Sequence, residues 1–274
     1  MYKTLIPGAI GHGKPIGEAV IGAADAGFEG IWLSAADLEG PVGETAKLLE
    51  DAGLRAAGFD LPVRFRGGET EFLEDMKGLR RLAERAARLG ASRCATWISP
   101  ASDSADYSRN LSFHAERLGA ICGALGEYGV LFGLEFVGTP SARANARYEF
   151  IYNLDGALEL CDATGAPNCG LLLDLWHWDM AGQGSGDFSK LSNGRVALVH
   201  VNDAPIGADL ETRGDSPREL PGETGILRAA EFMEGLRSIG YDGPIAAEPF
   251  RKDLAEMSYE GAMRLVSRSI DRIL

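Results

Sequence analysis

Four short apolar segments of this sequence each end in a side chain that could bind a metal ion. Glu135 follows LFGL, Asp174 follows GLLL, His200 follows ALV and Glu248 follows IAA. Because an isolated buried charge costs several kcal/mol, carboxylates in such surroundings must be paired or metal-bound. Three carboxylates and one imidazole favour Mn²⁺, with Mg²⁺, Co²⁺ and Zn²⁺ as alternatives. The segment ends therefore predict a site for one divalent metal ion.

Any one of these four residues could instead be a structural partner in an ion pair. That alternative explains a single residue as well as metal binding does. Four potential ligands at the same end of four successive strands are much harder to explain separately. The interpretation therefore depends on the elements that hold them.

Eight short apolar segments alternate with longer amphipathic segments along the chain. Segments that are apolar on both faces are typical of parallel strands covered by helices. Between them, the segment 71–90 repeats apolar residues at helical spacing, and glycine recurs between a helical segment and the next strand. We predict a single-domain (β/α)8 TIM barrel over residues 1–274. Its strands are expected within 3–11, 28–35, 54–63, 92–99, 130–138, 169–176, 196–203 and 244–250.

A doubly wound open sheet is the alternative for such alternation, but no GxGxxG motif follows the first apolar segment. In a TIM barrel the loops after strands form the catalytic face, so the four potential ligands would meet there. The longest of these loops, 205–224, contains Arg213, Arg218 and Glu223. A loop of this length is expected to act as a lid or to contact substrate.

Composition excludes several classes of protein. The 274 residues include 27 basic and 40 acidic side chains, a net charge of −13 that disfavours nucleic acid as a partner. The N-terminal segment does not read as a signal peptide, and no apolar run is long enough to span a membrane. Four cysteines show no CxxC pair, and the three in apolar or Ala/Gly-rich segments, Cys94, Cys122 and Cys169, are expected to be reduced core residues. We expect a cytoplasmic protein that does not associate with membranes.

The sequence resembles the sugar phosphate isomerase/epimerase group of xylose-isomerase-like barrels over essentially its whole length. The resemblance rests on LEF at Glu135, LLLDLWHWDM at Asp174, VHVNDAP at His200, RELPGET around Glu223 and AAEPF at Glu248. It implies that Glu135, Asp174, His200 and Glu248 bind one divalent metal ion, as in ketose 3-epimerases and inosose isomerases. It also implies that His177 contacts the sugar.

The chemistry available to such residues can be stated directly. A metal ion beside a carbonyl and its neighbouring hydroxyl acts as a Lewis acid and eases loss of the α-proton, which gives an enediolate. Two carboxylates on different sides of the substrate can remove this proton and return one. We assign Glu135 and Glu248 as the acid/base pair as well as ligands, and we assign Asp174 and His200 as ligands alone.

Substrate contacts are expected from His177, Arg213, Trp97 and His12. The alternatives are core packing for His177 and Trp97 and a surface salt bridge for Arg213. Two positions depart from the ketose 3-epimerases: Ile206 stands where they carry arginine, and Ser141 where they carry a substrate-contacting glutamate.

Two further residues have an open assignment. Asp203 is expected either to orient the long loop or to touch substrate. His114, on a predicted helix, is expected to be a surface or packing residue.

The first functional hypothesis is an isomerase or epimerase acting on a keto sugar or inosose. The second is a lyase on the same metal site, such as an inosose or dehydroshikimate dehydratase, which would expel a β-hydroxyl after the same proton abstraction. A DNA-repair endonuclease of the same barrel type needs more histidines than the four present. A binding protein without catalysis fits the full ligand set poorly. The expected partner is a small sugar or cyclitol, and a homo-oligomer is possible.

Overall fold

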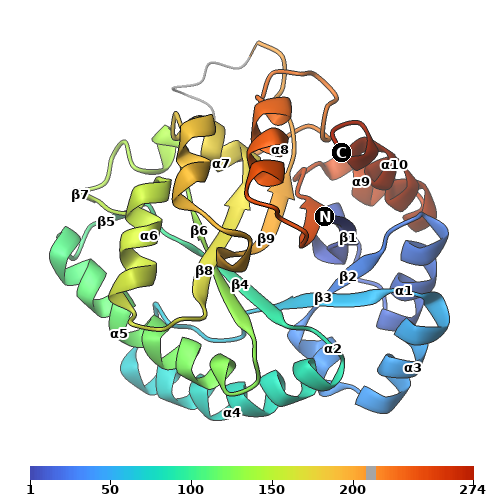
Figure 1. Cartoon of the computed structure of the whole chain (residues 1–274), viewed down its shortest axis with the longest axis horizontal. Coiled ribbons are helices and arrows are strands. Elements are labelled where there is room, and N and C mark those ends of the chain that lie inside the picture. The colour runs from blue at the N-terminus through green and yellow to red at the C-terminus, as the bar shows by residue number, and fades with distance from the viewer. Residues whose placement is uncertain (208–213) are drawn as a thin grey trace.

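Eight parallel strands close into a barrel, as the sequence predicts (Figure 1). The computed structural model describes residues 1–207 and 214–274. Neighbouring strands follow the order β1-β10-β9-β8-β6-β4-β3-β2. The barrel strands are β1 (Tyr2–Leu5), β2 (Gly30–Leu33), β3 (Arg55–Asp60), β4 (Arg93–Ile98), β6 (Leu131–Phe136), β8 (Cys169–Asp174), β9 (Val196–Val201) and β10 (Pro244–Ala247). Each lies within one of the eight predicted segments except β1, which begins one residue earlier, at Tyr2.

Helices surround the barrel. They are α1 (Ile16–Asp25), α2 (Ala35–Glu39), α3 (Val42–Ala52), α4 (Glu69–Arg88), α5 (Tyr107–Gly126), α6 (Leu154–Ala163), α7 (Leu175–Met180), α8 (Ala229–Ser238), α9 (Lys252–Glu256) and α10 (Tyr259–Asp271). Short 3-10 helices are η1 (Pro7–Ile10), η2 (Pro140–Ala142), η3 (Ser185–Lys190) and η4 (Asn193–Arg195). A separate antiparallel pair, β5 (Ala101–Ser102) and β7 (Tyr148–Glu149), was not predicted because two-residue strands leave no periodic pattern.

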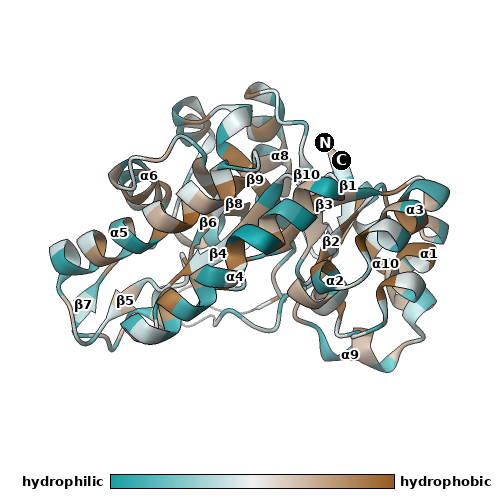
Figure 2. Ribbon diagram, turned by 90° about the horizontal axis from the view of Figure 1, so that it is seen from below, coloured by the Kyte–Doolittle hydropathy of each residue, from teal (hydrophilic) through white to brown (hydrophobic). Residues whose placement is uncertain are grey.

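The helices cover the barrel through their apolar faces. In α4, Phe72, Leu79 and Leu82 are buried while the charged residues between them face outward, so hydrophilic and hydrophobic segments alternate along its ribbon in Figure 2. The four cysteines are buried free thiols, which agrees with the core prediction for Cys94, Cys122 and Cys169 and adds Cys161 to the core. Among the described residues, no helix has the length and apolar character needed to span a membrane.

The period of two along each strand places the candidate ligands at the mouth of the barrel. A small apolar cluster that includes Ala95, Leu172, Leu198 and Ala246 is distinct from the larger core beneath the helices. Because alternate residues of a strand face the same side, the residue two positions further along also faces the barrel interior. This next layer contains Trp97, Glu135, Asp174, His200 and Glu248.

The Asp203 carboxylate anchors the loop after β9. This buried side chain accepts hydrogen bonds from the backbone N–H groups of Thr224, Gly225 and Leu227 at 2.9, 2.7 and 3.0 Å. Its own backbone pairs with Glu219 across an isolated antiparallel bridge. Asp203 therefore orients the loop, which was one of the two roles predicted for it.

We expect Asp203→Ala to lower the free energy of unfolding at pH 7 by about 2–4 kcal/mol, because several amide donors lose their acceptor. Burial raises the pKa of Asp203, but the backbone hydrogen bonds outweigh it and lower that pKa. A carboxylate with a lowered pKa contributes stability above its unfolded value of about 3.9 and loses it as the pH falls. The difference from wild type should therefore shrink below about pH 4.

Chemical denaturation at several pH values measures this effect. Asp25→Ala, at an exposed position on α1, is the matched control and should change little. An equal loss of stability in both variants, or a loss in Asp203→Ala that does not depend on pH, would contradict the assigned role.

Candidate metal centre

Four side chains converge at the carboxyl ends of the strands. Ligand atoms of Glu135, Asp174, His200 and Glu248 all lie within 4.8 Å of one another. His200 Nδ1 is 3.5 Å from Glu135 Oε1, 3.7 Å from Asp174 Oδ2 and 3.4 Å from Glu248 Oε2. The structure thus brings together all four residues that the sequence singled out.

These separations fit a shared cation better than hydrogen bonds. Neither ring nitrogen of His200 has a hydrogen-bond partner among the described residues, and the same is true of the buried Glu135 Oε1. Buried polar atoms are rarely left without partners. Donor atoms that bind one divalent ion at about 2.0–2.2 Å lie roughly 3 Å or slightly more from each other. The donor set therefore fits a divalent metal ion.

Asp174 serves two elements at once. It ends β8 and is also the N-cap of α7, with Oδ1 accepting from the backbone N–H of Trp176 at 2.6 Å. Its other oxygen, Oδ2, faces His200. The strand therefore leads into the helix without a loop, which fixes this carboxylate and the first turn that carries His177.

Arg218 lies at the centre of the site, although the sequence analysis named it only as part of the long loop and assigned it no contact. Its side chain is fully buried, and Nη1 donates to Asp174 Oδ2 at 2.8 Å and to Glu248 Oε2 at 2.9 Å. Nη2 donates to Asp215 Oδ1 at 2.6 Å. The resemblance to the ketose 3-epimerases led us to expect an arginine at the position of Ile206. Instead, Arg218 enters the site from further along the same loop. The available signal was the RELPGET segment, to which Arg218 itself belongs.

His177 is buried beside this arginine. Arg218 Nη2 lies 3.2 Å from His177 Nε2, and a guanidinium can only donate, so Nε2 acts as the acceptor. Burial lowers the pKa of His177. Both observations describe a neutral imidazole with its proton on Nδ1.

The carboxylates differ in their electrostatic surroundings. Burial raises the pKa of Glu135 to about 7. Burial also raises the pKa of Asp174, but Arg218 and the histidines outweigh it and lower that pKa to about 2. For Glu248 the effect of burial is outweighed by His200 and Arg218, and its pKa is lowered. Glu135 and Glu248 thus differ in proton affinity, a pattern common in acid/base pairs.

A cavity of about 380 Å³ opens above these residues. Glu135, Glu248, His177 and Arg218 line it on one side. Trp97, which is 48% exposed, and Phe250 supply apolar walls. Phe250 adopts φ 47°, a left-handed conformation unusual for a bulky side chain and often found at functional sites. Trp97 and His177 therefore both face the predicted site.

The other two predicted substrate contacts, His12 and Arg213, are not found at this cavity among the described residues. His12 is not among the residues that line this cavity: its Nε2 lies 2.9 Å from the Leu254 carbonyl oxygen, and its ring packs against Tyr259. The strand-end position suggested a pocket residue, but η1 carries it toward α9 and α10 instead. Arg213 lies outside the described residues.

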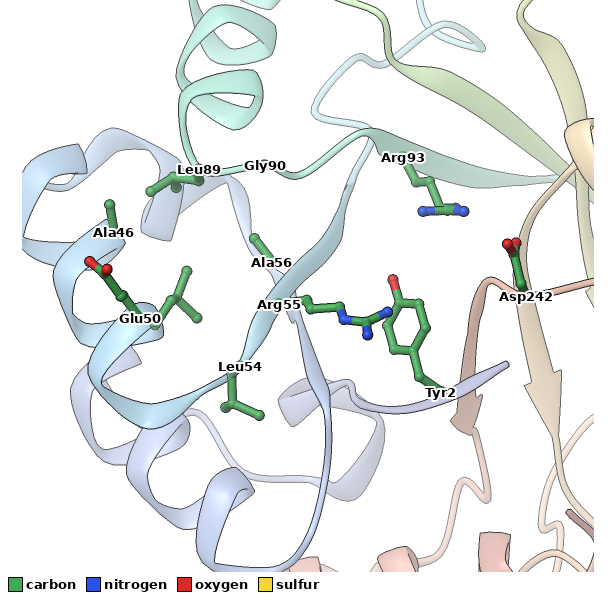
Figure 3. Close-up of a pocket in the computed structure, with 11 residues that line it drawn as sticks. Tyr2, Ala46, Glu50, Leu54, Arg55, Ala56, Leu89, Gly90, Arg93 and Asp242 are labelled. Carbon is green, nitrogen blue, oxygen red and sulfur yellow. The ribbon is translucent and has the colours of Figure 1, made fainter.

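A second cavity lies at the opposite, amino-terminal end of the barrel (Figure 3). It measures about 530 Å³ and is lined by Arg55, Arg93, Glu50 and Asp242 together with apolar residues. Its charged residues balance, so it offers no net charge to a ligand. Catalytic sites of TIM barrels lie at the other end, where the four candidate ligands meet.

Comparison with known proteins agrees with this architecture. The model of the xylose isomerase-like TIM barrel family matches residues 22–269. The chain belongs to this family. A xylose isomerase domain protein from Alicyclobacillus acidocaldarius has a structure that matches 100% of this chain and 98% of its own, with a TM-score of 0.90 and 29% identity.

Two curated relatives in this family carry names of enzymes. An inosose isomerase from Halalkalibacterium halodurans is 29% identical over 140 residues, which cover 50% of this chain and 45% of the relative. An L-ribulose 3-epimerase from Methylomonas sp. is 28% identical over 253 residues, 87% of this chain and 80% of the relative. The chain spans about half the length of the inosose isomerases that it matches.

We expect Mn²⁺ to raise the melting temperature of the protein and excess EDTA to reverse the rise, because a ligand that binds only the folded state stabilises it. His200→Ala should abolish the rise, since it removes the only nitrogen donor of the cluster. Thermal denaturation with metal analysis of the dialysed protein measures both. His12→Ala is the matched control and should respond to metal like wild type. An undiminished response in His200→Ala would place the ion elsewhere.

Arg218 and a cation would both contact Asp174 and Glu248, so their positive charges oppose each other. We expect Arg218→Gln to bind Mn²⁺ about tenfold more tightly, because a nearby positive charge is removed. Without metal the variant should be less stable than wild type, since two carboxylates lose their partner. Titration calorimetry measures the affinity, and Arg228→Gln, at an exposed ion pair with Asp179, is the control. Weaker binding by a folded Arg218→Gln would show that Arg218 supports the ion instead.

Proposed function

We propose that this protein is a divalent-metal-dependent isomerase or epimerase that moves a proton at the carbon beside the carbonyl of a keto sugar or inosose. The observation that carries the proposal is the convergence of Glu135 and Glu248 on one cavity with Asp174 and His200 between them. The names of the inosose isomerase and L-ribulose 3-epimerase relatives support it. The residue roles given below are part of this proposal, and the geometry of the candidate centre supports them.

The four-residue cluster would hold the metal ion, for which Mn²⁺ is our first choice on grounds of donor chemistry. The bound ion would supply Lewis acidity to the substrate carbonyl and its neighbouring hydroxyl. Mg²⁺, Co²⁺ and Zn²⁺ suit the same donors.

Glu135 and Glu248 would transfer the protons. They come from β6 and from the end of β10, which flank β8 and β9 in the barrel. They therefore approach the cavity from opposite flanks of the Asp174–His200 pair. One carboxylate removes the α-proton and the other delivers a proton to the opposite face or the neighbouring carbon. Their different proton affinities suit these two tasks.

Arg218 and His177 would position the substrate. A fixed guanidinium offers several donors to a substrate oxygen, and the neutral imidazole adds one polar contact beside it. Trp97 and Phe250 would cover the apolar C–H face of a sugar and reduce the access of water. Asp174 and His200 transfer no proton in this scheme.

Hydrogen exchange in D₂O tests the proposal. The Mn²⁺-loaded protein is incubated with a panel of inososes and ketoses, the metal is removed, and the products are examined by NMR. We expect deuterium at a carbon next to the carbonyl, together with an epimer or an isomer. A dehydrated enone would identify a lyase instead. No exchange with any compound, with metal bound, would contradict the proposed activity.

We expect Glu135→Gln and Glu248→Gln each to slow the exchange by about 10²–10⁴-fold, because general acid/base catalysis contributes an effect of that size. Exchange rates are compared at equal metal occupancy, which is measured for each variant. Glu260→Gln, at an exposed position on α10, is the control. Unchanged exchange in either site variant with metal bound would rule out the two-carboxylate mechanism.

A further inference from the structure

A third cavity adjoins the metal cavity at the carboxyl end of the barrel. It measures about 410 Å³ and lies between the segment after β4 and the first half of α5, at the green edge of the barrel in Figure 1. Ser99 lines both this cavity and the metal cavity, so the two are neighbours. A substrate with its carbonyl beside Glu135 and Glu248 could therefore extend toward this second space.

The lining of this cavity is positively charged. Arg66, from the segment after β3, and Arg109, on α5, both line it, and no carboxylate does among the described residues. The Arg109 side chain has no hydrogen bond or ion pair with another described residue. Ser102 and Ser104 add hydroxyl groups.

Arg66 also contacts Trp97, which lines the metal cavity. Its guanidinium lies 3.9 Å from the centre of the Trp97 ring, and Nη1 donates to the Trp97 carbonyl oxygen at 2.7 Å. Trp97 in turn lines the metal cavity. One N–H group of Arg66 is thus bonded to the Trp97 carbonyl oxygen, and the other N–H groups remain available to a ligand.

His114 lines the same cavity and adds no charge to it. The side chain is only 4% exposed, and Nδ1 donates to the Asn110 carbonyl oxygen at 2.8 Å. The lone pair is therefore on Nε2, which has no hydrogen-bond partner among the described residues. Burial and the neighbouring Arg66 and Arg117 lower the pKa of His114, which keeps the ring neutral.

We infer that this cavity is a subsite for an anionic group of the substrate, so that the compound turned over is a keto sugar or cyclitol carrying a phosphate or a carboxylate. Arg66, Arg109 and the serine hydroxyls bind the anion. The inference rests on the proposed function for the reaction, and on the lining of this cavity alone for the anion.

The test compares three ketoses that share one carbon skeleton. D-fructose is neutral, D-fructose 6-phosphate carries a phosphate and D-fructuronate carries a carboxylate. For the Mn²⁺-loaded protein, exchange in D₂O gives kcat/KM and titration calorimetry gives Kd. We expect at least one anionic compound to exceed fructose by about tenfold or more in both measurements, as a charge-assisted arginine contact allows.

Variants of Arg109 test whether the preference for anionic compounds arises in this cavity. Arg109→Gln should reduce the advantage of the anionic compound over fructose to about threefold or less, because it removes one of the two positive charges that line the cavity. Arg109→Lys should retain most of the advantage because it keeps the charge. Arg264→Gln, at an exposed position on α10, is the matched control and should behave as wild type.

The outcomes separate this inference from the proposed function. Exchange that favours fructose, or an anion preference that survives Arg109→Gln, overturns the anionic subsite and leaves the isomerase proposal intact. Binding that prefers an anion and depends on Arg109, without exchange of any compound, supports the subsite and counts against the proposed reaction. The better of the two anionic compounds identifies the group as phosphate or carboxylate.

Discussion

Repulsion between carboxylates in a space with little water is the constraint on which the carboxyl end of this barrel depends. Glu135, Asp174 and Glu248 present oxygens within 4.8 Å of one another and of His200. Such a group is unstable without positive charge close by. Arg218 provides part of this positive charge, and a divalent ion would provide the rest. Arg218 reaches the centre from the loop after β9, and Asp203 holds the far end of that loop by hydrogen bonds. The position of the positive charge therefore depends on the anchoring of the loop.

The barrel interior strengthens this constraint. Beneath the four polar residues lies a layer of apolar side chains that includes Leu172, Leu198 and Ala246. This floor excludes water from one side of the centre, which accounts for the large effect of burial on the pKa of Glu135. The opposite side is the open cavity. Charge compensation therefore has to come from the protein or from a ligand entering through the mouth.

The sequence could predict what depends on periodicity and could not predict what depends on long-range contacts. Eight apolar segments, with a potential ligand at the end of several of them, sufficed to place Glu135, Asp174 and His200 at neighbouring strand ends. Arg218 escaped because its position is set by the bridge between Asp203 and Glu219 rather than by its distance from His200 along the chain. His12 was expected in the pocket, yet the 3-10 turn after β1 diverts it to Leu254. Neither effect leaves a repeating pattern.

The double use of Asp174 explains why the strand ends carry different acids. One of its oxygens caps α7 and the other faces the centre, so the length of this side chain is fixed by two elements at once. A glutamate there would carry its oxygens about one methylene further from the backbone and would lose the cap geometry. Glu135 and Glu248 cap no helix, and their extra reach is free to serve the cavity. The short side chain of Asp174 thus suits its cap, and the longer side chains of Glu135 and Glu248 can extend toward the cavity.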